Sequence, residues 1–270
     1  MRREAYAQFL ALERDHWWFR GRRAVYLALL DRLLARRGRC ADPRAPAARP
    51  RRVLDLGCGP GGFLPGLAER CETVVACDVD LECLRGIAGR QDLARPVPRL
   101  CSPAAPLPFR DGAFDLLCLF DVLEHLDDEA GALREARRVL APGGVLLLSV
   151  PAYPWLFANN DRVAMHRRRY TRRTLAAAVE GAGFAILRNT HANVLLAPAI
   201  VPVALALKAL ETKPGAEVSD PCERTNLSWP LPRWAHGALW RVFAAETCFT
   251  GRWNAPFGHS IALLAEKTGP

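Results

Sequence analysis

The chain has 270 residues and half of them are hydrophobic, so it can bury a full core and a globally disordered protein is excluded. Lysine occurs only at positions 208, 213 and 267, so 34 of the 37 basic residues are arginine and the net charge is +9. This charge permits an anionic partner such as a membrane surface, but no basic–aromatic binding module is evident and nucleic acid is not the expected partner.

The nine cysteines are scattered along the chain and none forms a Cys-x-x-Cys pair. We therefore expect small apolar thiols in a reducing compartment, with neither a disulfide framework nor a metal site. The N-terminal residues lack the apolar core of a secretory signal peptide, which makes the cytoplasm the expected location.

The predicted elements alternate between helices and strands. Residues 3–37 are expected to form two helices, and the breaker-rich stretch 38–50 a loop. Further strands are expected at 52–56, 73–77, 114–120, 145–150, 184–187 and 259–266. Helices are expected at 61–70, 81–90, 129–140 and 171–182, and a proline-rich connection at 95–108. This alternation is typical of a doubly wound α/β fold, a parallel sheet with helices on both faces.

Residues 191–256 interrupt the alternation with an apolar segment, 194–210, and an aromatic helix candidate, 234–249. We interpret them as a mostly helical insertion that caps the ligand edge of the sheet. The apolar segment is a little short for a spanning helix and contains two prolines. Two hypotheses remain open for it: a cap helix buried against the sheet, or a surface that dips into a membrane and admits a lipid-like or isoprenoid substrate.

The stretch Val53-Leu54-Asp55-Leu56-Gly57-Cys58-Gly59-Pro60-Gly61-Gly62 predicts a buried strand that turns sharply into a helix. Glycines let such a turn adopt positive φ and let a nucleotide-like cofactor approach the bare backbone. The spacing formally matches the dinucleotide fingerprint, but Asp55 would repel a pyrophosphate at the helix N-terminus. A cationic cofactor such as S-adenosylmethionine reverses that argument. Asp78 ends the second strand and can accept hydrogen bonds from both ribose hydroxyls of either cofactor.

Several segments, in this order, resemble class I S-adenosylmethionine-dependent methyltransferases of the small-molecule type. They are 53–62, Asp78, 107–115, 121–126 and 140–144, and the last strand resembles the antiparallel strand that ends that fold. The resemblance implies a seven-stranded, mostly parallel Rossmann-like sheet in one domain, 1–270. Its parts would be a helical N-terminal cap at 1–37, a cofactor-binding core at 51–190, the insertion at 191–256, and the final strand and tail at 257–270.

The resemblance also implies a cofactor site. Asp55, Gly57 and Gly59, with Cys58 between them, would line the methionine end of the cofactor. Asp78 would bind the ribose and Val79 would lie against the adenine, while Phe120 and Asp121 would face the cofactor. The acidic residue that often binds the adenine amine in such enzymes is absent from 102–106, which leaves backbone groups or Ser102 for that contact.

Methyl transfer is an in-line displacement that depends on alignment, and it needs a base only if the acceptor must lose a proton. The catalytic candidates are His125, His166 and Tyr170, with His16 and Tyr153 as further candidates. A structural role for His125 and a solvated basic loop around His166 are open alternatives.

The aromatic run 17–19 is expected to pack in the core or to form a lid over the cofactor. In the lid arrangement, Arg20 or Arg23 would pair with the carboxylate of the cofactor.

The predicted activity is S-adenosylmethionine-dependent methyl transfer to an oxygen, nitrogen or carbon of a small, apolar acceptor. One alternative is an NAD(P)-dependent oxidoreductase. Another is a non-catalytic cofactor-binding partner protein at the membrane. The oligomeric state does not follow from the sequence.

Overall fold

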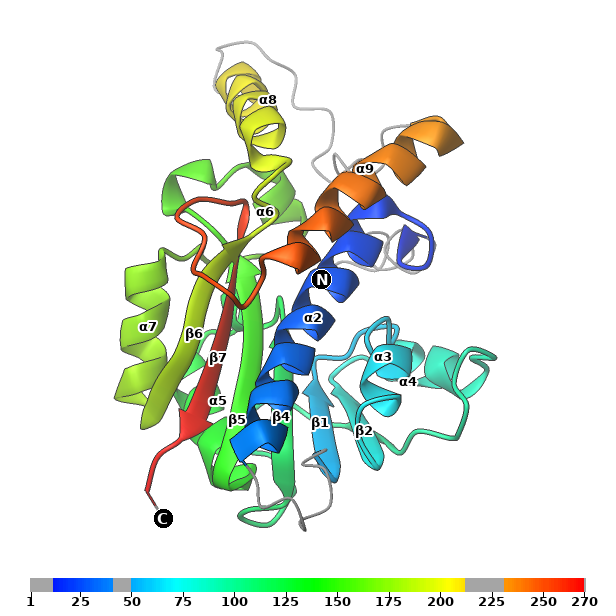
Figure 1. The fold of residues 1–270 in the computed structure, drawn as a ribbon, viewed down its shortest axis with the longest axis vertical. Coiled ribbons are helices and arrows are strands. Elements are labelled where there is room, and N and C mark those ends of the chain that lie inside the picture. The colour runs from blue at the N-terminus through cyan, green and yellow to red at the C-terminus, as the bar shows by residue number, and fades with distance from the viewer. Residues whose placement is uncertain (1–11, 41–49, 212–230, 270) are drawn as a thin grey trace.

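The computed structural model describes residues 12–40, 50–211 and 231–269, and these residues build one seven-stranded sheet (Figure 1). The strands are β1 (Arg52–Leu56), β2 (Thr73–Asp78), β3 (Arg99–Cys101), β4 (Phe114–Phe120), β5 (Leu140–Pro151), β6 (Phe184–Ala192) and β7 (Ser260–Lys267). Their order is β3-β2-β1-β4-β5-β7-β6, and β7 runs antiparallel to both of its neighbours while the other pairs are parallel. The predicted doubly wound, mostly parallel sheet is confirmed.

Helices cover both faces of this sheet, so its central strands β4 and β5 are apolar at most positions. One hydrophobic cluster joins β4 residues Leu116 and Cys118 to helices α2 (Trp17–Cys40), α3 (Leu64–Ala68), α4 (Leu81–Ala88) and α9 (Arg233–Ala245). A second cluster joins Leu117 and Leu119 to helices α5 (Glu129–Val139) and α7 (Arg172–Gly181) on the opposite face. Successive side chains of a strand point to opposite faces, so a strand covered twice must be apolar at every position.

Side-chain caps set the starts of the helices on the second face. The Asp128 carboxylate accepts a hydrogen bond from the Gly131 N–H at 2.7 Å, and the Thr171 hydroxyl accepts one from the Thr174 N–H at 3.1 Å. Each cap satisfies a backbone donor that the first helical turn leaves free. The predicted starts of both helices are confirmed.

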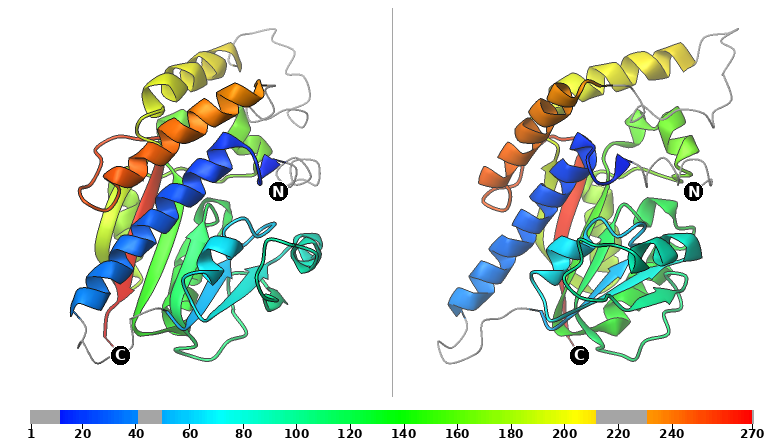
Figure 2. Two further views of the ribbon diagram at one scale, coloured as in Figure 1. Left: turned by 45° about the vertical axis from the view of Figure 1, so that its right-hand side comes forward. Right: turned by 90° about the vertical axis from the view of Figure 1, so that its right-hand side faces the viewer.

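The insertion contributes α8 (Ala197–Glu211), α9 and the short helix η4 (Glu246–Cys248). Helix α9 lies alongside α2, and α8 extends beyond the end of the sheet (Figure 2). Residues 212–230 of the predicted insertion lie outside the described residues. Of the helices in the described ranges, none combines the length and apolarity that crossing a membrane requires.

Several predicted boundaries are wrong. Helix α2 continues to Cys40, past the predicted loop start at 38. Most of that loop (41–49) and residues 3–11 of the first predicted helix lie outside the described residues. Strand β3 lies inside the predicted connection 95–108, and α3 begins only at Leu64. The short helices η1 (Leu123–His125), η2 (Pro154–Leu156) and α6 (Asn159–Val163) were not predicted. Strand β5 begins at Leu140, whereas the sequence predicts a strand start at 145.

Strand β6 continues to Ala192, whereas the sequence predicts a strand that ends at 187. The added residues include Arg188 and Asn189, which hide the strand pattern, but β6 pairs with β7 from Phe184 opposite Lys267 to Ala192 opposite Ser260. A long partner strand supplies backbone hydrogen bonds that the side-chain pattern does not reveal.

Candidate functional site

A cavity of about 700 Å³ opens at the carboxyl ends of β1, β2, β4 and β5. The strand order reverses between β1 and β4, and ligands of open α/β sheets bind at such a reversal. All the residues that the sequence predicts for the cofactor line this cavity: Asp55, Gly57, Cys58, Gly59, Asp78, Val79, Phe120 and Asp121. The opposite wall is apolar and includes residues of α8 and α9.

The glycine turn after β1 has the conformation that its composition predicts. Gly57, Gly59 and Gly61 have φ of 72°, 52° and 84°, in the left-handed region that favours glycine. A Cβ on Gly57 would lie 2.3 Å from Cγ2 of Val122. Asp78 fixes the turn, because its carboxylate accepts hydrogen bonds from the Gly59 N–H at 2.8 Å and the Asp80 N–H at 2.9 Å.

The Asp55 side chain is buried at the bottom of the cavity, and its Oδ2 atom has no hydrogen-bond partner. Desolvation, with Glu13 and Asp78 nearby, raises the pKa of Asp55 to about 8. The carboxyl group therefore holds its proton at neutral pH until a cation lies beside it. Burial thus prevents the permanent negative charge that the sequence suggests for Asp55.

Glu13, in the segment that precedes α2, contacts the glycine turn. Its Oε1 accepts a hydrogen bond from the Gly62 N–H at 2.9 Å, and its Oε2 lies 3.6 Å from Arg90 Nη1. Arg23 donates to the Glu13 carbonyl oxygen at 2.6 Å. These contacts hold the segment before α2 over the cavity, which Glu13 helps to line.

Among the arginines that follow the aromatic run, Arg22 is the one that enters the cavity. Its Nη2 lies 2.5 Å from Asp121 Oδ2, and Asp121 also accepts a hydrogen bond from the Ser149 hydroxyl at 2.8 Å. Asp121 has φ of 54°, a conformation that costs free energy in a non-glycine residue and that these contacts hold in place. Arg20 instead lies over the Trp240 ring at 4.1 Å, and neither Arg20 nor Arg23 lines the cavity.

Trp17, Trp18 and Phe19 all line the cavity, and Trp17 and Trp18 also pack against the hydrophobic core. The Trp18 ring packs on Phe243 of α9 at 5.9 Å and on His259 at 5.3 Å between ring centroids. The aromatic run thereby links α2 to the insertion.

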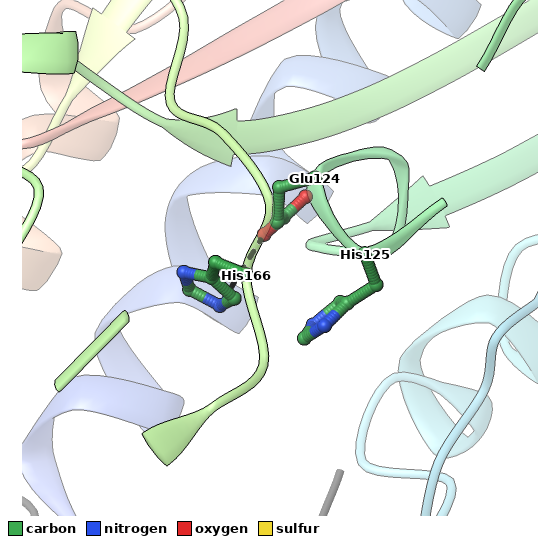
Figure 3. A group of neighbouring side chains, drawn as sticks. All are labelled: Glu124, His125 and His166. Atoms are coloured by element: carbon green, nitrogen blue, oxygen red, sulfur yellow. Dashed lines mark ion pairs between the residues drawn. The ribbon is translucent and has the colours of Figure 1, made fainter. Parts of the chain in front are cut away.

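Glu124, His125 and His166 meet on one wall of the cavity (Figure 3). Glu124 and His125 lie in η1, directly after β4, and His166 lies between α6 and α7. The Glu124 side chain is completely buried, and neither of its oxygens has a hydrogen-bond partner among the residues that the structure describes. Its Oε1 lies 4.0 Å from His166 Nε2. The ring centroids of His125 and His166 lie 4.7 Å apart. Desolvation raises the pKa of Glu124 and lowers that of His125 to about 4.

Asp161 of α6 orients His166. Its Oδ1 lies 2.8 Å from His166 Nδ1 and accepts a hydrogen bond from Arg169 Nε at 2.7 Å. Desolvation alone would raise the pKa of Asp161, but the hydrogen bonds from His166 and Arg169 lower it to about 2. An ionised Asp161 accepts a hydrogen bond from the Nδ1–H group of His166, so His166 presents Nε2 to the cavity.

Tyr170 does not belong to this wall. Its ring is buried in the second hydrophobic cluster, and its hydroxyl donates to Glu129 Oε2. Tyr153 is also absent from the lining, because its ring stacks on His191 and Phe257. The structure thus brings His125, His166 and His16 to the cavity, while Tyr170 and Tyr153 serve in packing.

Several polar residues of the site were not predicted from the sequence, among them Glu13, Arg22, Glu124 and Asp161. Glu124 offered a signal, because it is an acid that directly follows a buried strand inside the segment 121–126. The other three are placed by tertiary contacts that local spacing does not encode.

A family model described as a methyltransferase domain matches residues 18–189 of the chain. Ajmaline N-methyltransferase of Rauvolfia serpentina is 30% identical over 187 residues, which cover 68% of this chain and 62% of that protein. A probable S-adenosylmethionine-dependent methyltransferase of Mycolicibacterium smegmatis is 31% identical over 180 residues, which cover 65% of this chain and 62% of that protein. The chain thus spans about three fifths of the length of these relatives.

Solved structures share the fold at lower identity. The [4+2]-cyclase SpnF superimposes with a TM-score of 0.54 at 21% identity, covering 90% of this chain and 82% of the cyclase. The N-methyltransferase NodS of Bradyrhizobium japonicum, solved with S-adenosylhomocysteine, gives a TM-score of 0.53 at 20% identity, covering 69% and 87%. A cyclase and a methyltransferase on one architecture show that the fold alone does not fix the chemistry.

Proposed function

This chain belongs to the methyltransferase domain family, which uses S-adenosylmethionine, and from that membership we propose that it transfers a methyl group to a small apolar acceptor. The observation that carries the proposal is a single cavity that joins the glycine turn, with Asp55 and Asp78, to an apolar wall on α8. The family match displaces the NAD(P)-dependent oxidoreductase alternative.

The residues of the cavity fit the chemistry of this cofactor. Asp55 Oδ2 is a buried acceptor without a partner, which suits a cationic ligand and disfavours a pyrophosphate. The bare backbone at Gly57 and Gly59 permits close approach, and Asp78 lies where ribose hydroxyls bind in related folds. We assign Asp55 to the charged methionine end, Asp78 to the ribose, and the exposed Val79 to the rim beside the adenine.

When bound, the cofactor supplies an electrophilic methyl group on a sulfonium. The chain contributes alignment and the exclusion of water, because methyl transfer is an in-line displacement. Apolar rings line the cavity and exclude water from it. They are the stacked rings of Phe63 and Phe120, with centroids 3.9 Å apart, and the aromatic run of α2. Groups that bind or release protons gather at Glu124, His125 and His166, so we expect the reacting atom of the acceptor to lie against that wall.

The acceptor end of the cavity favours an apolar, lipid-like molecule. Helix α8 contributes Ile200, Val203 and Leu207 to the lining, while Leu205 and Leu210 are 41% and 53% exposed. An apolar helix face that is left exposed is typical of a segment that lies on a membrane surface. We propose that α8 contacts a bilayer and that the acceptor enters beside it.

Calorimetry tests the cofactor assignment. The purified chain is titrated with S-adenosylhomocysteine and, separately, with NADH, and we expect binding of the first only. Incubation with methyl-labelled S-adenosylmethionine and cell extract, followed by phase partition, should place label in the organic phase. Cofactor binding without any labelled product would favour the non-catalytic alternative, and NADH binding alone would refute the proposal.

Sedimentation with anionic vesicles tests the membrane contact separately. We expect the wild-type chain to sediment with the vesicles, and Leu205→Glu with Leu210→Glu to abolish this without affecting cofactor binding. Leu187→Glu is the matched control, because Leu187 of β6 is 40% exposed and lies outside the cavity lining. Wild-type chain that stays in the supernatant would end the membrane proposal and leave methyl transfer untouched.

A further inference from the structure

We propose that Glu124, His125 and His166 form a binding site for one divalent transition-metal ion on the acceptor wall of the cavity. A metal ion at this wall is an addition to methyl transfer itself, because no metal site is expected from the sequence. Its placement beside the reacting atoms rests on the proposed function. Figure 3 shows the three side chains converging from η1 and from the segment before α7.

The geometry of the three ligand atoms is close to that of a bound ion. One atom from each residue can be chosen so that all three lie within 4.8 Å of one another, and Glu124 Oε1 lies 4.0 Å from His166 Nε2. Ligand atoms about 2.1 Å from a tetrahedral zinc ion are separated by about 3.4 Å. Small side-chain rotations would therefore close the site around an ion.

Glu124 supplies an independent observation. Its side chain is fully buried, yet both carboxyl oxygens lack a hydrogen-bond partner within the described part of the chain. A buried carboxyl group without partners is costly, and folded proteins normally satisfy such groups. Two nearby cations are already engaged, Arg22 by Asp121 at 2.5 Å and Arg169 by Asp161 at 2.7 Å. A metal ion would satisfy Glu124 where these arginines do not.

His166 is oriented by a hydrogen bond to its second ring nitrogen, as metal-binding histidines usually are. His166 Nδ1 is hydrogen-bonded to Asp161 at 2.8 Å, which leaves Nε2 free on the side of Glu124. The His125 ring lies against the His166 ring, with the two centroids 4.7 Å apart. A hydrogen-bond partner such as Asp161 fixes the tautomer and orients the ring toward the metal.

The ligand set indicates which ions fit and what they would do. Two imidazoles and one carboxylate suit zinc and the first-row transition metals better than magnesium or calcium, which prefer oxygen ligands. Three protein ligands leave a coordination position open, the pattern of catalytic rather than structural sites. That position would face the cavity, where the ion could bind and acidify an oxygen or nitrogen of the acceptor.

The test uses untagged full-length chain, stripped with chelator and titrated with Zn²⁺ by calorimetry and with Co²⁺ by visible absorption, without cofactor. We expect one ion per chain and cobalt d–d bands. Glu124→Gln and His166→Ala should weaken Zn²⁺ binding at least tenfold, and Asp161→Asn about 10- to 100-fold through the orientation of His166. Glu246→Gln, a second fully buried glutamate outside the cavity lining, is the control and should bind Zn²⁺ as the wild type does.

Titration of every variant with S-adenosylhomocysteine separates the two proposals. Cofactor binding by a wild-type chain that binds no metal would overturn the metal site and leave the proposed function standing. Metal binding by a wild-type chain that binds no cofactor would refute the proposed function and leave the metal site standing. Zn²⁺ binding that is unchanged in Glu124→Gln and His166→Ala would place the ion elsewhere, for example on cysteines, and would also overturn the inference.

Discussion

Asp55 couples cofactor binding to pH. Burial raises its pKa to about 8, and a cationic ligand requires the ionised form, so binding must release a proton at neutral pH. We expect the affinity for S-adenosylhomocysteine, which keeps the ammonium group, to fall by up to about tenfold per pH unit below 8. Calorimetry between pH 6 and 9, in buffers of different ionisation enthalpy, measures both the affinity and the proton release. Binding that is independent of pH and of buffer would contradict the assignment of Asp55.

The Arg22–Asp121 pair is a second residue-level test. Arg22 is buried and Asp121 is 25% exposed, so removing one partner should cost about 1–3 kcal/mol, less than the loss at a fully buried pair. We expect Arg22→Met to lower the free energy of unfolding by that amount in urea titrations, and Asp121→Asn in the same chain to recover part of it. The exposed pair Arg85–Glu82 provides the control, since Arg85→Met should cost less than about 1 kcal/mol. Equal losses at the two sites would contradict this account.

At the residue scale, the sequence predicts what is local and misses what is brought in from a distance. The residues assigned to the cofactor lie at the ends of three strands, and the sheet places all of them in one cavity. Glu13 contacts Gly62, 49 positions along the chain, through packing of the segment before α2, which no spacing rule reports. Tyr170 was placed correctly beyond β5, but its ring turns into the core instead of the cavity.

At the scale of elements, the contact between α2 and α9 holds the insertion over the cavity. A Cβ on Gly21 would lie 2.1 Å from the Phe243 ring, so Gly21→Ala would force the two helices apart. We expect a loss of about 1–3 kcal/mol of unfolding free energy, as for other overpacked sites. Gly86 of α4 is the matched control: a Cβ there meets nothing within 4 Å, and Gly86→Ala should stabilise by about 0.4–1 kcal/mol. Chemical denaturation measures both, and a neutral Gly21→Ala would show that the helices are not closely packed.

Elements were predicted well where composition and pairing agree. Strand β4 is apolar at nearly every position and has the predicted bounds, because both of its faces are covered. Strand β3 has three residues at the edge of the sheet, two of them exposed, and carries no apolar pattern to detect. Its existence depends on pairing with β2, which is a property of the sheet and not of the segment.

For the whole molecule, the buried carboxyl groups make stability depend on pH. Burial raises the pKa of Asp55 to about 8 and that of Glu246 to about 7, whereas unfolded carboxyl groups ionise near pH 4. The folded chain therefore holds protons that the unfolded chain releases, and stability falls as the pH rises toward 8. His16, His125 and His259 have pKa values lowered to about 4, so their contributions change only below pH 6.5.

Asp55→Asn isolates the largest of these effects above pH 6.5. Between pH 6.5 and 8, the unfolded wild type is stabilised by its ionised Asp55 while the folded chain keeps the proton, which lowers the free energy of unfolding by about 2 kcal/mol. The amide of Asp55→Asn avoids this loss. Between pH 6.5 and 8, we expect the difference in Tm between Asp55→Asn and the wild type to increase by about 4–8 °C in favour of the variant. The Tm values are measured by circular dichroism without ligand. The net charge affects both proteins alike, so the difference reports the buried carboxyl. If the Tm of the variant and that of the wild type change equally with pH, Asp55 is already ionised in the folded chain. The Tm of Glu246→Gln should increase less relative to the wild type, because the pKa of Glu246 is nearer 7.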